Sequence, residues 1–234
     1  MSIVKEVLPG MEYMIMQHEY WDNKWKTNDI QFHLPEANEL LINYSSLLPK
    51  GKVFVPLCGK SLDMKWLLSQ GYEIIGVELS EVACRAFFTD NDLSFSLKKQ
   101  APFTIFKSEH IEIWCGDIFQ LPLDVCTNLT AIYDRAALIA LPEEIRIQYV
   151  EFIKKLSKAQ PYLDMLLLTI EYEQILLQGP PFSIKESDVW RLYADTFNIT
   201  KLELPNDYTS VFSKNTKFQN IKTQEGIYWL TYSK

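Results

Sequence analysis

The chain has 234 residues, of which 47% are hydrophobic, and its formal net charge is −7. This size and composition predict a single α/β domain, residues 1–234, with a large buried core. The negative charge argues against a nucleic-acid partner, because proteins that follow a phosphate backbone carry a basic face.

No apolar run reaches the length of about 20 residues that is needed to span a bilayer. The first residues also lack the apolar core of a signal peptide. We therefore expect a cytoplasmic protein without a membrane partner, acting as a monomer. The four cysteines form no CxxC pair and have no metal-ligand spacing with the three histidines, so we expect small core residues and no metal.

The N-terminal segment, residues 1–33, is predicted to be an arm that covers the active site. Residues 1 to about 16 are weakly patterned, which favours a mobile stretch. Trp21 and Trp25 then stand four apart, so they share one face of a helix. The local pattern favours packing of this face against the core, while a sharper alternative is an aromatic lid with Phe32 and His33 at its far end.

The stretch from Lys52 to Ser61 reads as a buried strand followed by a tight glycine turn. An amphipathic helix follows over 62–70, and a second strand over 73–78 ends in the carboxylate of Glu78. Strand, turn and helix in this order place a nucleotide-like ligand at the carboxyl end of a parallel sheet. Gly59 and Glu78 also have the separation of roughly 20 residues expected between a turn glycine and a ribose-binding acid. We therefore expect a nucleoside cofactor here.

The remaining elements alternate between helices and strands. Because alternation of this kind is typical of a mostly parallel sheet with helices on both faces, we expect a three-layer Rossmann-like fold. The last two strands are joined without a clear helix, so one of them should run antiparallel. Residues 91–110 are polar and irregular in pattern, and we expect a short hairpin around 104–106. The other predicted strands span 111–114, 131–138, 162–171, 199–204 and 226–232. The predicted helices span 34–48, 82–89, 141–157 and 183–196.

The turn is poor in glycine, which bears on the type of cofactor. A dinucleotide fingerprint needs three glycines, and only Gly59 is present. A P-loop needs a glycine at position 54, which is Phe54. A cofactor with ribose and adenine but no phosphate, such as S-adenosylmethionine, fits better. We expect Glu78, followed by Leu79, to bind the ribose, Asp117 and Ile118 to border the adenine, and Leu57 to Gly59 to face the amino-acid tail.

An ordered set of short motifs resembles the thiopurine S-methyltransferases over nearly the whole chain. The motifs are Trp21-x-x-x-Trp25, Phe32-His33, Val55-Pro-Leu-Cys-Gly-Lys60, Met64-Lys-Trp66, Gly76-Val-Glu-Leu-Ser80, Ile118-Phe119, Tyr133-Asp-Arg-Ala-Ala-Leu138 and Gly179-Pro-Pro-Phe182.

The resemblance implies a class I methyltransferase fold, with a seven-stranded sheet whose last strand is antiparallel. It also implies that Trp21, Leu57, Glu78 and Arg135 contact S-adenosylmethionine. Trp25 belongs to the same aromatic element, and Phe32 matches a position that faces the methyl acceptor.

Methyl transfer from a sulfonium is an in-line displacement, so the protein mainly aligns the two reactants and excludes water. Trp21 can stabilise the sulfonium by cation–π attraction. Arg135 cannot act as a base at neutral pH, so any catalytic role is to stabilise a thiolate or the cofactor carboxylate. The alternative for Arg135 is an ion pair with Asp134 or Glu171. His33 is either an acid–base group or a simple hydrogen-bonding partner.

One departure concerns the acceptor. Animal members of the family carry an arginine in the C-terminal region that lines the acceptor pocket. Residues 206–224 here contain no arginine, and their only cationic residues are lysines. A lysine cannot replace a planar guanidinium. A small aromatic or heterocyclic thiol is the expected acceptor. Detoxifying methylation of selenium or tellurium species, a silent S-adenosylmethionine-binding regulator and a nicotinamide dehydrogenase are the alternatives.

Overall fold

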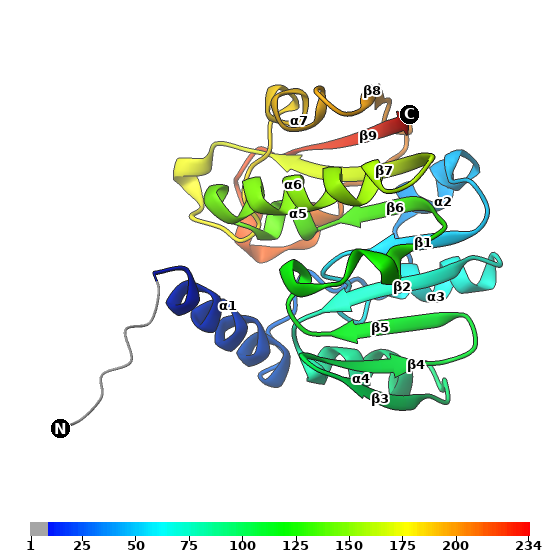
Figure 1. The fold of residues 1–234 in the computed structure, drawn as a ribbon. Coiled ribbons are helices and arrows are strands. Elements are labelled where there is room, and N and C mark those ends of the chain that lie inside the picture. The colour runs from blue at the N-terminus through cyan, green and yellow to red at the C-terminus, as the bar shows by residue number, and fades with distance from the viewer. Residues whose placement is uncertain (1–8) are drawn as a thin grey trace.

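The computed structural model describes residues 9–234, with side chains described from residue 18 onward except at residues 214 and 233 (Figure 1). Their strands form one mixed sheet in the order β3-β4-β5-β2-β1-β6-β7-β9-β8. The strands are β1 (Lys52–Val55), β2 (Glu73–Glu78), β3 (Ser96–Gln100), β4 (Phe103–Lys107), β5 (Ile111–Cys115), β6 (Leu129–Arg135), β7 (Tyr162–Glu171), β8 (Asn198–Leu202) and β9 (Gln224–Ser233).

The centre of the sheet is parallel: β1 pairs with β2 and β6, β2 pairs with β5, and β6 pairs with β7. The last strand, β9, is antiparallel to both β7 and β8, as the sequence predicted. The chain builds outward from β1 through β2 to β5 and then returns to β6 on the other side. Ligands of such sheets bind at the carboxyl ends of the strands where the order reverses, which here is between β1 and β6.

Helices cover both faces of the sheet (Figure 1). The helices are α1 (Pro9–Lys26), α2 (Glu39–Tyr44), α3 (Leu62–Ser69), α4 (Glu81–Asp90), α5 (Ala137–Ala140), α6 (Glu143–Lys158) and α7 (Glu186–Tyr193). Short 3-10 turns occur at Ser45–Leu47, Ile118–Gln120, Leu123–Cys126, Gln174–Leu176, Val211–Lys214 and Thr216–Phe218.

Two hydrophobic clusters sit on opposite faces of the sheet. Side chains of α5, α6 and α7 pack on one face, and those of α2, α3 and α4 pack on the other. Within β1, Phe54 belongs to the first cluster, while Val53 and Val55 belong to the second. This alternation follows from the two-residue period of a strand and explains why β1 is apolar throughout.

The sheet has two more strands than the seven predicted, because β3 and β4 form an antiparallel hairpin that continues the sheet beyond β5. The hairpin expected around 104–106 is therefore present, but it is longer than predicted and extends over residues 96–107. All five residues of β3 are exposed, so no alternating burial pattern marks it in the sequence. Lys98 and Lys99 on this edge strand discourage pairing with another chain.

The N-terminal arm also differs from expectation. Residues from Pro9 onward form α1, rather than an irregular stretch to residue 16, and residues 1–8 lie outside the described part of the chain. The helix predicted over 34–48 is reduced to α2, which starts at Glu39 with Asn38 as its N-cap. Within residues 9–234, no helix is both long and apolar enough to cross a membrane.

Candidate active site

Glu78 anchors the loop that follows β1 to the end of β2. Its Oε2 accepts the backbone N–H of Gly59 at 2.8 Å, and its Oε1 accepts the backbone N–H of Ser80 at 2.8 Å. The side chain is only 6% exposed, and this burial raises the pKa of the carboxyl group against the opposing effect of the hydrogen bonds. A carboxylate has about four lone-pair sites, so a hydrogen bond from a ribose hydroxyl can still be accepted.

Two more of the predicted cofactor residues lie beside the end of β2. The backbone N–H of Gly116 donates to the Glu78 carbonyl at 2.9 Å, which brings the loop after β5 to this point. In that loop Asp117 caps a 3-10 turn through the N–H of Phe119 at 3.0 Å, and Ile118 is buried. Leu57 has a positive φ of 45°, so its carbonyl and side chain adopt a turn conformation that few non-glycine residues take.

The aromatic residues of the N-terminal arm form one cluster. Phe32 makes edge-to-face contacts with Trp21 and Trp25, at ring-centroid distances of 5.6 Å and 5.3 Å. Trp25 is buried, and its ring occupies the space beside Gly59 where a side chain would otherwise begin. Trp25 therefore packs against the loop after β1, in agreement with the interpretation that this helix face packs against the core.

Trp21 has a different position, because it lines a cavity together with Phe32. Its empty volume of about 1030 Å³ includes the part that is open to solvent. Its walls come from the arm, from the loops after β6 and β7, and from the segment before β9. Among the lining residues are Tyr20, Asn38, Arg135, Ile139, Leu168, Thr169, Pro180, Pro181, Phe212, Lys217 and Glu225.

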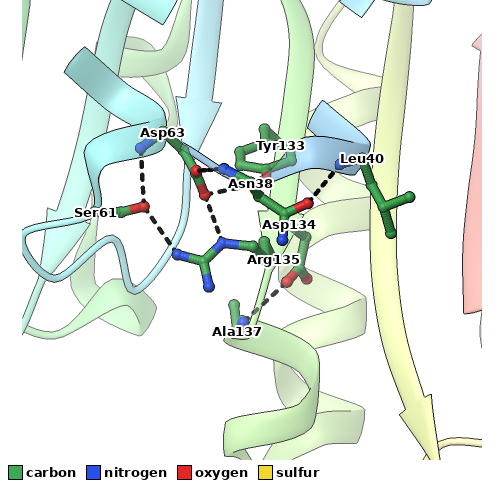
Figure 2. Close-up of polar contacts among 8 residues, drawn as sticks. All are labelled: Asn38, Leu40, Ser61, Asp63, Tyr133, Asp134, Arg135 and Ala137. Atoms are coloured by element: carbon green, nitrogen blue, oxygen red, sulfur yellow. Dashed lines mark hydrogen bonds and ion pairs between the residues drawn. The ribbon is translucent and has the colours of Figure 1, made fainter. Parts of the chain in front are cut away.

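Arg135 enters this cavity from the end of β6 and is held by the start of α3. Figure 2 shows its Nε donating to Asp63 Oδ2 and its Nη2 donating to Ser61 Oγ, the latter at 2.9 Å. The Asp63 carboxylate accepts two further hydrogen bonds. The Tyr133 hydroxyl donates one at 3.1 Å, and the backbone N–H of Asn38 donates the other at 2.7 Å. Burial disfavours the charged form of Arg135, but the adjacent Asp63 carboxylate outweighs this and raises its pKa, so the guanidinium stays protonated.

The predicted alternative partner for Arg135 was wrong, because the ion pair is with Asp63 rather than with Asp134 or Glu171. Asp134 points to the other side of β6, where it accepts the N–H groups of Ala137 and Leu138 at the start of α5. It also accepts the hydroxyl of Tyr149 at 2.6 Å. Successive residues of a strand face opposite ways, so Asp134 and Arg135 serve different faces of the sheet.

His33 follows Phe32 in the turn after α1, but the two side chains line different spaces. It lines a neighbouring groove between residues 31–39 and 209–216, whereas Phe32 lines the cavity. Burial lowers the pKa of His33, and the nearby charges of Lys60 and Arg135 lower it further. The imidazole is therefore neutral near pH 7.

Sequence analysis missed Asp63, Asn38 and Glu225. Asp63 reads in the sequence as an ordinary acid in the first turn of a helix, which gives no hint of its arginine partner. Asn38 reads as an N-cap at best. Glu225 precedes the strand predicted over 226–232, but it is the second residue of β9, is only 6% exposed and accepts the Tyr208 hydroxyl at 2.8 Å. Burial raises the pKa of this carboxyl group.

Two further observations concern cofactor chemistry. Across the described residues there is no cluster of three or more side chains suited to a metal ion. The four cysteines are all free, and burial raises the pKa of Cys58 and Cys84 well above the usual value. These two thiols therefore stay protonated and behave as core residues.

Comparison with known proteins identifies the family. Residues 16–233 match the thiopurine S-methyltransferase family. The chain belongs to this family. It is 41% identical to a thiopurine S-methyltransferase of Pseudomonas fluorescens SBW25 over 191 residues, covering 80% of this chain and 87% of that protein. The corresponding enzyme of Shewanella pealeana is 40% identical over 221 residues, covering 93% and 96%.

Solved structures support the class I methyltransferase fold. A Burkholderia thailandensis 1,6-didemethyltoxoflavin-N1-methyltransferase with bound S-adenosylhomocysteine is similar at a TM-score of 0.66 and 12% identity, over 99% of this chain and 94% of that one. Magnesium protoporphyrin IX methyltransferase of Synechocystis, with bound S-adenosylmethionine, is similar at a TM-score of 0.58 and 14% identity, over 94% and 96%. The chain is thus a methyltransferase of the thiopurine S-methyltransferase family that uses S-adenosylmethionine.

Proposed function

We propose that the protein transfers the methyl group of S-adenosylmethionine to the sulfur of a small aromatic or heterocyclic thiol. The observation that carries this proposal is the cavity lined by Trp21, Phe32 and Arg135, next to the anchored loop that contains Gly59. Its walls are mostly apolar and aromatic, which suits a flat ring, and its one guanidinium suits an acidic thiol. The thiopurine S-methyltransferase name of the relatives agrees with such an acceptor.

The cofactor would lie across the carboxyl ends of β1, β2 and β5. In this proposal Glu78 accepts hydrogen bonds from the ribose, with Leu79 and Ile118 beside the nucleoside and Asp117 at its border. Leu57 and Gly59 lie along the amino-acid tail. S-adenosylmethionine supplies an electrophilic methyl group when it is bound, and the protein aligns it with the acceptor sulfur.

Within the cavity Arg135 stabilises negative charge on the acceptor sulfur or on the cofactor carboxylate. Its raised pKa excludes a role as a base, so a thiol acceptor must lose its proton to water or arrive as a thiolate. Trp21 faces the region of the sulfonium, where its ring contributes cation–π attraction. Phe32 excludes water from the acceptor ring, and His33 assists from the neighbouring groove by hydrogen bonding only.

An acceptor screen that measures S-adenosylhomocysteine tests the proposal. Purified protein, S-adenosylmethionine and benzenethiol or a heterocyclic thiol should give the methyl thioether, identified by mass spectrometry. Turnover of selenium or tellurium species without any thiol would replace the proposal with the metalloid alternative. Cofactor binding by calorimetry without transfer to any acceptor would instead indicate a silent regulatory module.

We further propose that residues 1–33 act as a lid on a single domain, in a monomeric cytoplasmic enzyme. The bond from the Ser80 hydroxyl to Asp22 at 2.9 Å links α1 to the end of β2, so the arm can respond to a cofactor there. Figure 1 shows the N-terminal half of α1 extending away from the sheet. Limited proteolysis should cleave the arm more slowly when S-adenosylhomocysteine is present, and equal rates would contradict the lid. Light scattering measures the molar mass in solution and so tests whether the enzyme is a monomer.

A further inference from the structure

Glu225 places a carboxylate on the wall of the cavity that also contains Arg135. The residue is buried, and its Oε2 accepts the hydroxyl of Tyr208 at 2.8 Å. Its Oε1 accepts the backbone N–H of Val211 at 3.1 Å. Because a carboxylate can accept about four hydrogen bonds, these two leave capacity for a donor that enters the cavity.

The sheet brings Arg135 and Glu225 to the same face. Arg135 pairs in register with Leu168 of β7, and Leu168 pairs with Ile227 of β9. Side chains two residues apart in a strand point to the same side, so Glu225 has the direction of Ile227. Leu168 and Ile227 both belong to the cluster that packs under α2, α3 and α4. The guanidinium and the carboxylate therefore reach the cavity from this one face, with β7 between their strands.

The charges on the cavity walls leave Glu225 in a distinct position. The lining residues include other ionisable side chains, which are those of Tyr20, Lys24, Asp29, Arg135 and Lys217. Asp29 forms an ion pair with Lys24 at the surface, and its side chain is 42% exposed. Glu225 is instead buried and hydrogen-bonded to neutral groups. It is thus a carboxylate that is shielded from solvent and held in one place.

The surroundings of Glu225 also favour proton uptake. Burial raises the pKa of its carboxyl group, and the hydrogen bonds from the 208–211 segment and the charge of Arg135 lower it by less. A general base is most effective when its pKa lies close to the pH of the reaction. The attacking form of a thiol is the thiolate, so a protonated acceptor needs such a base. Arg135 cannot supply this function because it stays protonated.

We propose that Glu225 receives the proton of a thiol acceptor through a water molecule in the cavity. The inference rests on the proposed thiol methylation and names the group that takes up the proton. The S–H bond breaks, the proton passes through the water to a Glu225 oxygen, and the electron pair stays on the sulfur. That pair then forms the bond to the methyl carbon as the bond between this carbon and the sulfonium sulfur breaks. The carboxyl group returns its proton to solvent when the products leave.

A purely structural role for Glu225, as an anchor of the 208–211 segment, is the alternative that the experiment has to separate. Glu225→Gln keeps the shape, an oxygen for the Val211 N–H and an amide that can donate to Tyr208, but it cannot take up a proton. Tyr208→Phe removes one anchoring bond and keeps the carboxylate. Glu173→Gln applies the same exchange at an exposed position after β7 and serves as the control. Thermal unfolding of each variant checks that the fold is intact.

Two thiols of similar size distinguish the roles. At neutral pH 4-nitrobenzenethiol is ionised and needs no base, whereas phenylmethanethiol is protonated. We expect Glu225→Gln to lower kcat/KM for phenylmethanethiol roughly 100-fold and to leave kcat/KM for 4-nitrobenzenethiol within about twofold of the parent protein. Tyr208→Phe and Glu173→Gln should keep the parent ratio of the two values.

The pH profile with phenylmethanethiol gives a second readout. In the parent protein kcat/KM should rise with pH as Glu225 loses its proton, because only the carboxylate can act as a base, and should then level off. In Glu225→Gln the rise should move to the alkaline range in which the thiol itself ionises.

Equal losses for the two thiols in Glu225→Gln would assign this residue a structural role, and no loss for either would remove it from the proton path. Failure of the parent protein to methylate phenylmethanethiol would also overturn the inference. Thiol methylation stands in all three cases as long as 4-nitrobenzenethiol is methylated. If the parent protein methylates neither thiol, the proposed function fails, and this inference fails with it.

Discussion

Asp63, in the first turn of α3, and Arg135, at the end of β6, form an ion pair that joins the two sides of the candidate site. The Asp63 side chain is 1% exposed and that of Arg135 is 14% exposed. Because α3 follows β1 and β6 is the neighbour of β1, the pair spans the point where the strand order reverses. Arg135 is thereby held at the cavity wall instead of moving freely on a loop.

Asp63→Asn should destabilise the protein by about 3 kcal/mol, because it leaves the buried guanidinium of Arg135 without its counter-ion. Urea unfolding measures the change. The control is Asp90→Asn, which removes the ion pair of Asp90 with Lys60, in which the Asp90 side chain is 50% exposed. That change should cost less than about 1 kcal/mol. Similar losses of unfolding free energy in both variants would show that burial does not make the Asp63–Arg135 ion pair more important for stability than an exposed one.

Glu78→Gln should weaken S-adenosylhomocysteine binding by at least about tenfold, since two backbone N–H groups need both carboxylate oxygens as acceptors. A glutamine has one acceptor oxygen, and its amide N–H₂ would face either Gly59 or Ser80. Calorimetry gives the dissociation constant. Glu73→Gln, at the exposed start of the same strand, is the control and should bind normally. An unchanged affinity in Glu78→Gln would remove this residue from the cofactor site.

Gly59→Ala should be more harmful than Gly71→Ala, although both residues have positive φ, at 52° and 80°. A Cβ at Gly71 meets nothing within 4 Å, so that variant reports only the backbone cost of about 1 kcal/mol. A Cβ at Gly59 would lie 2.7 Å from the ring of Trp25. We expect a further loss of about 1–3 kcal/mol as the indole is displaced. Equal unfolding free energies for the two variants would mean that Trp25 moves aside freely.

The stability of the protein should depend on the ionisation of Asp134. Burial raises the pKa of this carboxyl group to about 6, against a usual value of 3.8. The folded state therefore binds more protons between these two values, so the contribution of Asp134 to the unfolding free energy falls as the pH rises from about 4 to about 6.

Comparison with Asp134→Asn isolates this effect, because an asparagine can still accept from the start of α5 and donate to Tyr149. Relative to that variant, the parent protein should gain up to about 3 kcal/mol on acidification from pH 7 to pH 4. Guanidinium unfolding at several pH values measures the difference. A constant difference across this range would show that Asp134 titrates normally.

The sequence by itself determined the order of the main elements, the class of the fold and the family. Each depends on local chemistry that is visible along the chain: an apolar β1 ending in Leu57 to Gly59, and a β2 ending in Glu78. Burial of a parallel sheet on both faces requires apolar strands, and a tight turn requires glycine. The placement of Trp21 and Phe32 in one aromatic cluster could be expected from their spacing with Trp25.

Tertiary structure alone decided which residues complete the cavity and which residue holds Arg135 at its wall. Asp63, Asn38 and Glu225 come from three separate segments, and each one reads locally as an ordinary capping or surface residue. Their roles depend on burial and on partners far away in the chain, which a one-dimensional pattern does not encode. The extent of the hairpin of β3 and β4 was underestimated for a related reason, because the exposed strand β3 lacks the alternating burial that marks a strand in a sequence.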